Sequence, residues 1–155
     1  MEFNILDIFK NIGRGKRLTQ NNFVLGDIPY VSSTMNNNGV SAFVGNKKNV
    51  KIFNNCLTIA NSGSVGSTFY HPYSFVASDH VTHLKNKDFN KNIYLFISAI
   101  LNRLVNKYNF NREIKDKRLK RETVILPVND KNMPDYAYMN QYIKNIMYLN
   151  RVLEK

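Results

Sequence analysis

The stretch "CLTIANSGSVGSTFYHPYSFVASDHVTHL", residues 56–84, decides the fold class of this chain. On both sides of its middle, β-branched and aromatic residues alternate with small or polar ones, which is typical of strands with one buried face. In the middle, Gly63 and Gly66 can accept backbone angles that other residues avoid. The stretch therefore predicts strands joined by a glycine turn.

Segments of the same character precede it, so we expect five or six short strands in all, antiparallel for the most part or mixed. They are "DIPYVSST", "SAFVG" and "NVKIFN", residues 27–34, 41–45 and 49–54. Pro29 and Pro72 should lie at strand starts, edges or turns, where a missing N–H does little harm.

The first twenty residues give a weaker signal. Residues 1–9, "MEFNILDIF", fit either a strand or a short helix packed on the domain edge. Residues 12–19, "IGRGKRLT", hold two glycines and three cations, which predicts a loop or turn.

Helical periodicity begins at residue 92 and continues to about residue 108. Its apolar face consists of Ile93, Phe96, Ile97, Ile100, Leu101, Leu104, Val105 and Tyr108. This pattern predicts the main core helix, in which Phe96, Ile100 and Leu104 are buried. The expected fold class is thus α+β, with short strands around one core helix.

Residues 112–122 carry six cations and three anions, followed by a buried-looking strand at residues 123–128. A solvated loop or short helix and a contact with a polyanion explain this charge run equally well. Both interpretations stay open at the level of sequence.

A final helix is expected from Pro134 onward. Proline fits the first turn of a helix, and Asp135 suits its positive dipole end. Apolar residues then recur at alternating spacings of three and four, the seam of a coiled coil. They are Met139, Tyr142, Ile146, Leu149 and Leu153. Two heptads hold a partner weakly, so the helix packs on its own domain or joins a larger assembly.

Charge and cysteine content narrow the class of protein. The formal net charge is +11, which favours an anionic partner such as nucleic acid. The longest nearly apolar run, residues 94–101, is far below the ~20 residues of a membrane-spanning helix, so no membrane role is expected. Cys56 is the single cysteine. We expect it to be a small buried hydrophobe in a reduced, cytoplasmic protein.

Motifs for catalysis are incomplete. There is no glycine fingerprint or catalytic loop of a base methyltransferase, and "GSVGST" lacks the Gly-Lys ending of a phosphate-binding loop. Glu113 and Lys115 could belong to a nuclease motif, but Asp135 follows them instead of preceding them. His71, His80 and His83 suit hydrogen-bonding roles better than a shared metal site. We therefore expect no enzyme activity, no cofactor and no metal.

Several phrases in a fixed order carry a family resemblance. They are "FNILDIFKNIGRGKRLT", "GDIPYVSSTMNNNGVSAFV", "NCLTIANSGSVGSTFYHPYSF", "RLKRETVILPV" and "MPDYAYMNQYIKNI". In this order they resemble the target recognition domain of a type I restriction-modification specificity subunit. They are also similar to recognition domains of single-chain type II restriction-methylation enzymes. The likeness extends from Phe3 to about Leu149.

The resemblance implies a non-catalytic reader of double-stranded DNA. Residues 1–133 would form a target recognition domain that reads half of a bipartite site. Residues 134–155 would begin a spacer helix that pairs with a second recognition domain or a second copy, and docks methyltransferase subunits. A half-size subunit, a truncated product and a fragment all fit this length. The alternative is a decoy that binds the modification subunit through its helix without reading DNA.

Side-chain chemistry selects the expected DNA contacts, because Asn pairs with adenine, while Arg and Lys contact guanine or phosphate. The candidates are Lys16, Arg17, Ser32, Ser33, Thr34, Asn36, Asn37, Ser64, Ser67, Tyr70, Tyr73, Lys115, Lys117 and Arg118. The five cations are the first choice. Tyr70 and Tyr73 fit either the core or the DNA groove, and Asn38 with Gly39 is expected to shape its turn.

Overall fold

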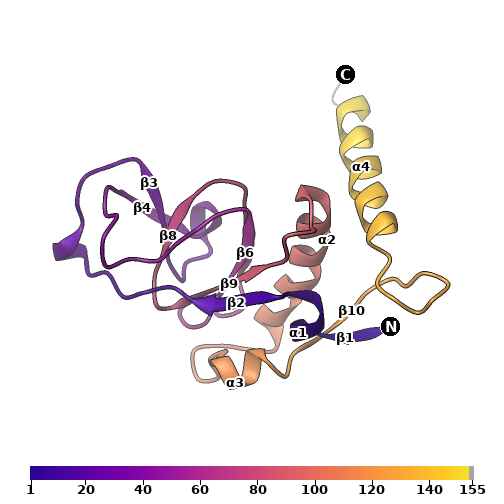
Figure 1. Ribbon diagram of the computed structural model, residues 1–155, viewed down its shortest axis with the longest axis horizontal. Helices are drawn as coiled ribbons and strands as arrows, with labels where there is room; N and C mark the ends of the chain where they lie inside the picture. The colour runs from indigo at the N-terminus through magenta and orange to yellow at the C-terminus, as the bar shows by residue number, and fades with distance from the viewer. Residues whose placement is uncertain (154–155) are drawn as a thin grey trace.

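The computed structural model describes residues 1–153, which form an α+β domain with a long helix at one end (Figure 1). Two four-stranded sheets and one two-stranded sheet are present in these residues. This confirms the expected fold class. Glu154 and Lys155, the last two residues of the predicted final helix, lie outside the described residues.

The first sheet is antiparallel throughout and has the order β2-β9-β6-β7. Its strands are β2 (Asn11–Arg14), β9 (Val81–Lys85), β6 (Cys56–Ala60) and β7 (Thr68–His71). The prediction of a loop at residues 12–19 was therefore wrong for its first three residues. Gly13 pairs with His83 in the neighbouring strand, and its carbonyl lies 2.7 Å from Nδ1 of that imidazole. The local sequence could not reveal this partner, which lies 70 residues away.

The second sheet is mixed and has the order β4-β3-β8-β5. Its strands are β4 (Val40–Val44), β3 (Ile28–Val31), β8 (Phe75–Ala77) and β5 (Ile52–Phe53). Strands β3 and β8 run parallel, and this pairing begins only at Tyr30, after Pro29. Residues 27–84 thus hold seven strands, one more than the upper expectation, because residues 68–84 turn twice to make three strands.

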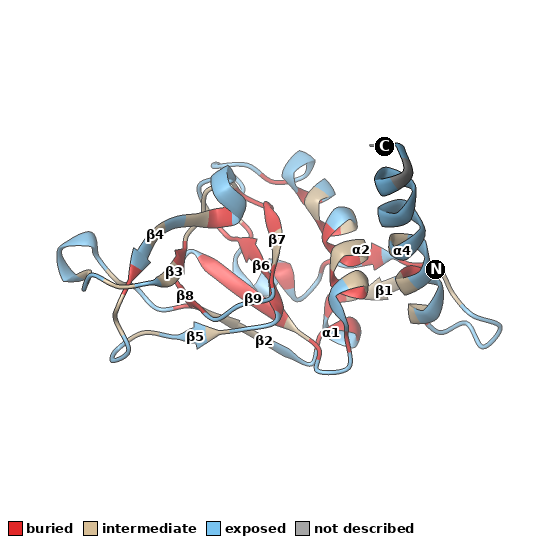
Figure 2. Ribbon diagram, turned by 90° about the horizontal axis from the view of Figure 1, so that it is seen from above, coloured by how far each residue is buried: buried red, intermediate tan, exposed pale blue. Residues whose placement is uncertain are grey.

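The main core lies between the first sheet and the helices, and a second cluster lies between the two sheets. Strand β6 serves both because its side chains alternate in direction. Leu57 and Ile59 join the main core, whereas Cys56 joins the second cluster. All three are fully buried, as the red colour of this strand in Figure 2 shows. The expected burial of Cys56 is confirmed, and this burial raises the pKa of its thiol to about 12.

The predicted core helix is α2 (Lys91–Leu101), which continues as a 3₁₀ helix over Asn102–Asn106. Asn90 caps it, since its side-chain oxygen accepts from the N–H groups of Asn92 and Ile93. Leu104 is buried as expected, but Phe96 and Ile100 are only half-buried. Phe96 turns toward the last helix, where its ring lies edge-on to Tyr142 with centroids 5.6 Å apart.

The chain closes on itself near the N-terminus. Strand β1 (Glu2–Asn4) pairs with β10 (Thr123–Ile125), and the short helix α1 (Ile5–Ile8) follows β1 directly. Residues 1–9 therefore form both a strand and a short helix. The predicted strand at residues 123–128 exists but ends at Ile125.

The last helix, α4 (Tyr136–Leu153), stands at the edge of the domain beside α2 (Figures 1 and 2). Pro134 lies before it and not in its first turn, because Asp135 is the cap: its carboxylate accepts from Tyr138 N–H at 2.9 Å. Met139 is completely buried in the main core, so the predicted seam is divided. No helix within residues 1–153 is long and apolar enough to cross a membrane.

Candidate nucleic-acid interface

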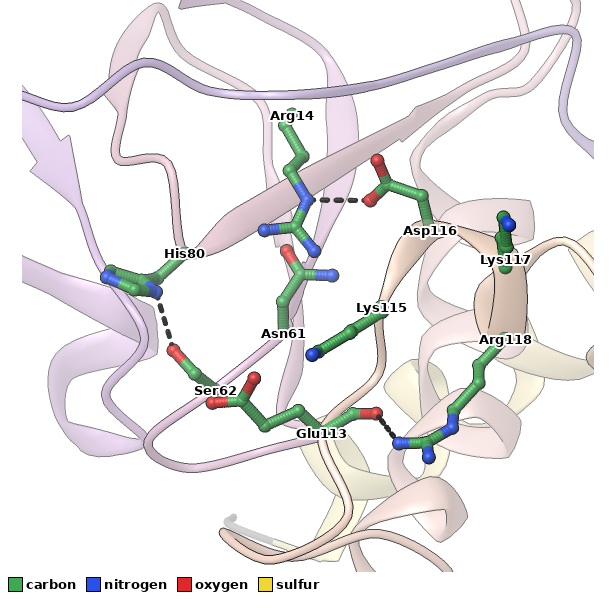
Figure 3. A pocket seen from close by; sticks show the side chains of 9 residues that line it. All are labelled: Arg14, Asn61, Ser62, His80, Glu113, Lys115, Asp116, Lys117 and Arg118. Atoms are coloured by element: carbon green, nitrogen blue, oxygen red, sulfur yellow. Dashed lines mark hydrogen bonds and ion pairs between the residues drawn. The ribbon is translucent and has the colours of Figure 1, made fainter.

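A groove of about 540 Å³ opens where the ends of β2, β6 and β9 meet the charge run, and we call it the cationic groove. Its lining residues are Arg14, Asn61, Ser62, His80, Glu113, Lys115, Asp116, Lys117 and Arg118. Figure 3 shows their side chains around a common hollow, although they come from four separate parts of the sequence. Four of them are permanent cations and two are carboxylates, so the groove is net positive.

Asn61 positions the charge run. Its backbone carbonyl accepts from Ile114 N–H at 3.1 Å, and its Nδ2 donates to the Ile114 carbonyl at 2.8 Å. Its Oδ1 accepts from Thr82 Oγ1 at 2.9 Å, which ties the same side chain to β9. Because Asn61 is buried and fully hydrogen-bonded, it is a structural support for the groove and not a free contact residue.

The charged side chains of the groove differ in how firmly they are held. Arg14 Nε donates to Asp116 Oδ1 at 2.6 Å, and Arg14 Nη1 donates to the Asp79 carbonyl at 3.1 Å. Arg118 Nη1 donates to the Glu113 carbonyl at 2.6 Å within its own segment. The charge run contains the short helix α3 (Asp116–Leu119), and its cations are exposed. This agrees with the interpretation of the run as a solvated loop or short helix.

A second groove, of about 420 Å³, adjoins the first, and we call it the serine groove. Its lining residues are Arg17, Leu18, Thr19, Gln20, Asn21, Tyr30, Ser32, Ser33, Ser78, Asp79 and His80. His80 lines both grooves, and its Nδ1 lies 2.8 Å from Ser62 Oγ. The two grooves therefore adjoin at His80, which forms the junction between them.

The glycine turn supports this junction. Gly63 has φ +58°, and a Cβ atom there would come within 2.6 Å of the Ser33 carbonyl oxygen. The same carbonyl accepts from Ser64 N–H at 3.0 Å, so the turn packs directly on the loop that holds Ser32 and Ser33, which we call the serine loop. The expectation that Gly63 and Gly66 adopt unusual backbone angles is confirmed, since Gly66 has φ +89°.

The structure brings together six of the predicted contact residues. Arg17, Ser32 and Ser33 line the serine groove, and Lys115, Lys117 and Arg118 line the cationic groove. Lys16 is exposed beside Arg17, and its backbone N–H donates to the Ala77 carbonyl. These residues form the candidate interface.

The asparagine loop divides between two surfaces. Its first serines face the serine groove, whereas Asn37 lines a separate hollow of about 640 Å³ with Tyr73 and Phe43. Asn36 is exposed, and its N–H donates to Thr34 Oγ1 at 3.2 Å. Residues 37–39 all have positive φ, so Asn38 and Gly39 do shape this turn.

Eight of the fourteen predicted contacts do not line either groove, and three of these eight belong to the glycine stretch and the strand after it. Ser67 is buried, and Ser64 is half-buried behind the glycine turn. Tyr70 stacks on Tyr94 of α2 with ring centroids 5.2 Å apart, and its hydroxyl donates to Asn55 Oδ1. Ser67 and Tyr70 therefore pack in the protein. The serines of the glycine stretch were selected for polarity alone, and the sequence did not show which of them the turn buries.

The histidines have different surroundings. His71 is fully buried with its Nε2 2.9 Å from Thr58 Oγ1, and burial lowers its pKa to about 4. His83 is buried beside Phe53, and this burial also lowers its pKa. Both have the hydrogen-bonding role that was expected. Within residues 1–153 there is no group of three His, Cys, Asp or Glu side chains that could hold a metal ion.

Sequence reasoning missed Arg14, Ser62 and His80 as parts of the interface. Arg14 belongs to a segment for which the sequence predicts a loop, and His80 was expected to have a hydrogen-bonding role and no more. The pairing of β2 with β9 brings them to one edge of the sheet. The usable signal was the polar run Ser78–His80 directly after β8, because strand ends often present side chains for binding.

Comparisons with known proteins show the family of this chain. The sequence model of the family "Type I restriction modification DNA specificity domain" matches residues 1–155. The chain belongs to this family. A specificity subunit of a type II restriction enzyme from Heyndrickxia coagulans, S.BcgI, is 35% identical over 144 residues, which are 92% of this chain and 42% of that protein.

Two solved specificity subunits have the same fold as this specificity domain. The type I S subunit from M. genitalium superposes with a TM-score of 0.69 at 19% identity, over 99% of this chain and 40% of that one. The HsdS subunit from Thermoanaerobacter tengcongensis superposes with a TM-score of 0.62 at 16% identity, over 98% of this chain and 39% of that one. The chain thus spans about two fifths of the length of the relatives that it matches.

Proposed function

We propose that this specificity domain reads half of a bipartite double-stranded DNA target for a restriction-modification complex. One observation carries the proposal: two adjoining grooves gather cations and small polar side chains from β2, the serine loop and the charge run around His80. Cations hold phosphates, and polar side chains on loops read base edges, so both parts of a DNA contact are available on one surface.

The cations of the interface are exposed and suited to phosphates. Lys115 and Lys117 lie on the rim of the cationic groove, where Lys16 and Arg17 continue the positive surface beside the serine groove. The polar side chains that line the serine groove include Ser32, Ser33, Gln20 and Asn21. These side chains can donate and accept hydrogen bonds, and they are the proposed candidates for base contacts. Thr34, Asn36, Asn37 and Tyr73 are proposed as secondary contacts at the border of the surface.

The length of the chain relative to its family supports the part of this proposal that assigns half of a bipartite target to one domain. Specificity subunits that match it are about two and a half times as long. We propose that residues 1–133 are the recognition domain and that α4 begins a spacer helix, which meets the counterpart of a second recognition domain or a second copy. The exposed apolar residues of α4 support this division, although Met139 anchors the helix in the domain core.

Catalysis in the proposed complex is assigned to partner methyltransferase and restriction subunits. The family model and the similar type II subunit are both described as specificity components. The chain itself is proposed to be non-catalytic and cytoplasmic, where its DNA lies. The decoy alternative is not favoured, because it gives no role to the two adjoining grooves.

The proposal is tested with the full chain, alone and in complex with its modification subunit. Fluorescence anisotropy on labelled duplexes should give an affinity that falls steeply with salt, because bound cations release counterions from DNA. Selection from a pool of random duplexes should also yield one short preferred sequence. Salt-sensitive binding without any preferred sequence would contradict the proposal, and so would the absence of duplex binding by the complex.

A matched pair of variants locates the binding surface. Lys115→Glu with Lys117→Glu reverses two charges of the cationic groove and should abolish duplex binding. Lys131→Glu with Lys144→Glu makes the same change in net charge on exposed lysines of the loop before α4 and of α4 itself, and neither lysine lines the cationic or the serine groove. The second variant should bind with nearly unchanged affinity at moderate salt. Equal losses in both variants would show that net charge, not this surface, determines binding.

A further inference from the structure

Arg14 is the cation of the cationic groove that the fold fixes most firmly. Its backbone belongs to β2 and pairs with Thr82 in β9, in the centre of the domain. Its side chain donates from Nε to Asp116 Oδ1 and from Nη1 to the Asp79 carbonyl. These contacts come from segments on opposite sides of the groove, and they restrain the plane of the guanidinium.

The guanidinium retains free hydrogen-bonding capacity after these contacts. It has five N–H donors, and the two hydrogen bonds use the single N–H of Nε and one of the two N–H groups of Nη1. Three donors therefore remain, including both of Nη2 and the second of Nη1. About a third of the side chain is exposed, and Figure 3 shows it extending into the hollow of the groove. A planar pair of donors on a restrained arginine matches the O6 and N7 acceptors of guanine.

Asp116 gives a second, independent reason to assign a reading role here. Its carboxylate lines a groove that would face phosphates, which it would repel. A site built only for phosphates gains nothing from this charge. A carboxylate that accepts from Arg14 Nε, however, fixes the orientation of the arginine fork. Its own side chain is 61% exposed, so it can hold this contact at the groove surface.

We infer that Arg14 determines specificity by donating two hydrogen bonds to O6 and N7 of one guanine, with Asp116 as its positioning residue. This inference rests on the proposed function and adds the identity of one base in the target. Lys115 and Lys117 are flexible point charges and serve the phosphates instead. Arg118 is held only within its own segment, through the Glu113 carbonyl, and is assigned to the backbone as well.

The test compares base preferences among variants of the full chain, in complex with the modification subunit. Random duplex pools are selected with the wild type, Arg14→Gln, Asp116→Asn and Lys117→Ala, and the selected pools are sequenced. The wild-type motif should contain a guanine whose preference falls about tenfold to a hundredfold in Arg14→Gln, with other positions unchanged. Asp116→Asn should weaken the same position in part. Lys117→Ala should lower the affinity for all sequences alike.

A modified base tests the contact without any protein variant. Replacing the selected guanine by 7-deazaguanine removes N7, and this should weaken wild-type binding about tenfold but leave Arg14→Gln unaffected. The inference fails if the motif contains no guanine, if Arg14→Gln lowers all sequences equally, or if 7-deazaguanine has no effect. In each of these cases the proposed function still stands, because a motif was selected. If the wild type selects no motif at all, the proposed function itself fails.

Discussion

Asn61 and Ile114 lie 53 residues apart in the sequence, yet two hydrogen bonds join them backbone to backbone and side chain to backbone. This pairing fixes the charge run against the end of β6. Because both residues are buried, the connection is shielded from competing water. The geometry of the cationic groove therefore depends on one asparagine that does not itself face a ligand.

Replacing Asn61 by alanine should destabilise the domain and open the groove. The change leaves the Ile114 carbonyl and the Thr82 hydroxyl without their partners, and each buried unsatisfied group costs about 1–3 kcal/mol. Urea unfolding should show the loss, and duplex affinity should fall as well. Asn106→Ala is the control, because this asparagine is exposed on the 3₁₀ helix. Equal stability of the two variants would contradict the supporting role of Asn61.

Gly63→Ala should distort the serine loop. The new Cβ would meet the Ser33 carbonyl, and a non-glycine residue at φ +58° is strained in addition. We expect a stability loss of at least about 1 kcal/mol and weaker sequence preference, measured by urea unfolding and duplex selection. Ser64→Ala changes the next residue but keeps its backbone contact with Ser33, so it should behave like the wild type. A fully stable Gly63→Ala would show that the turn tolerates a shift.

Stability should fall between about pH 6.5 and pH 4 because of His71. Burial lowers the pKa of this imidazole from 6.5 to about 4 in the folded state, so the unfolded chain binds the proton first as the pH falls. The stabilising contribution is complete above pH 6.5 and is lost on acidification, by roughly 3 kcal/mol. His83, whose pKa is also lowered by burial, acts in the same direction.

Urea unfolding at several pH values measures this dependence. His71→Gln removes one of the two buried imidazoles and should reduce the slope between pH 6.5 and 5, above the range where most carboxylates titrate. A wild-type slope retained in His71→Gln would assign the dependence to other groups.

The two parts of the α4 seam should respond differently to substitution. Met139→Ala removes a fully buried side chain and should cost about 2–5 kcal/mol of stability. Ile146→Asp with Leu149→Asp changes residues that are 39% and 56% exposed, so it should leave the domain folded but abolish association with a partner helix. Sedimentation of the chain with its modification subunit distinguishes these outcomes. An intact complex with both aspartates present would exclude this face of α4 as the contact.

Removing two positive charges from the groove should lower affinity for all duplexes alike. In the double variant Lys115→Ala with Lys117→Ala, each substitution should reduce the magnitude of the slope of log affinity against log salt concentration by about 1. Anisotropy titrations at several salt concentrations measure this slope. Ser32→Ala with Ser33→Ala leaves the net charge unchanged, so the slope should stay the same. A changed slope in the serine variant would mean that the serine loop orients the cations.

Local sequence patterns anticipated much of the fold, because periodicity and capping act over a few residues. Alternation gave the strands on either side of the glycine turn, and helical spacing gave α2. The same reasoning did not find β2, since Asn11 and Gly13 have little strand propensity and the strand is held by pairing with β9. It also placed Phe96 and Ile100 in the core, because it could not know where α4 would stand.

The candidate interface was only partly accessible in this way. Side-chain chemistry selected Arg17, Lys115 and Lys117, which do line the grooves, but it also selected Ser67 and Tyr70, which pack in the protein. Composition cannot separate an exposed serine from a buried one. Arg14 was missed because the residues that hold its side chain lie 65 or more residues away in the sequence. His80 was missed because its contact is Ser62, beside the glycine turn.

The sequence by itself determined the α+β class, the main helix, the burial of Cys56 and the net positive charge, since each follows from local periodicity or composition. Tertiary structure decided which loops meet and which polar side chains face outward. The reason is physical: strand pairing and long-range hydrogen bonds, such as those between Asn61 and Ile114, join segments that are far apart in the sequence, and local patterns do not show which segments will meet.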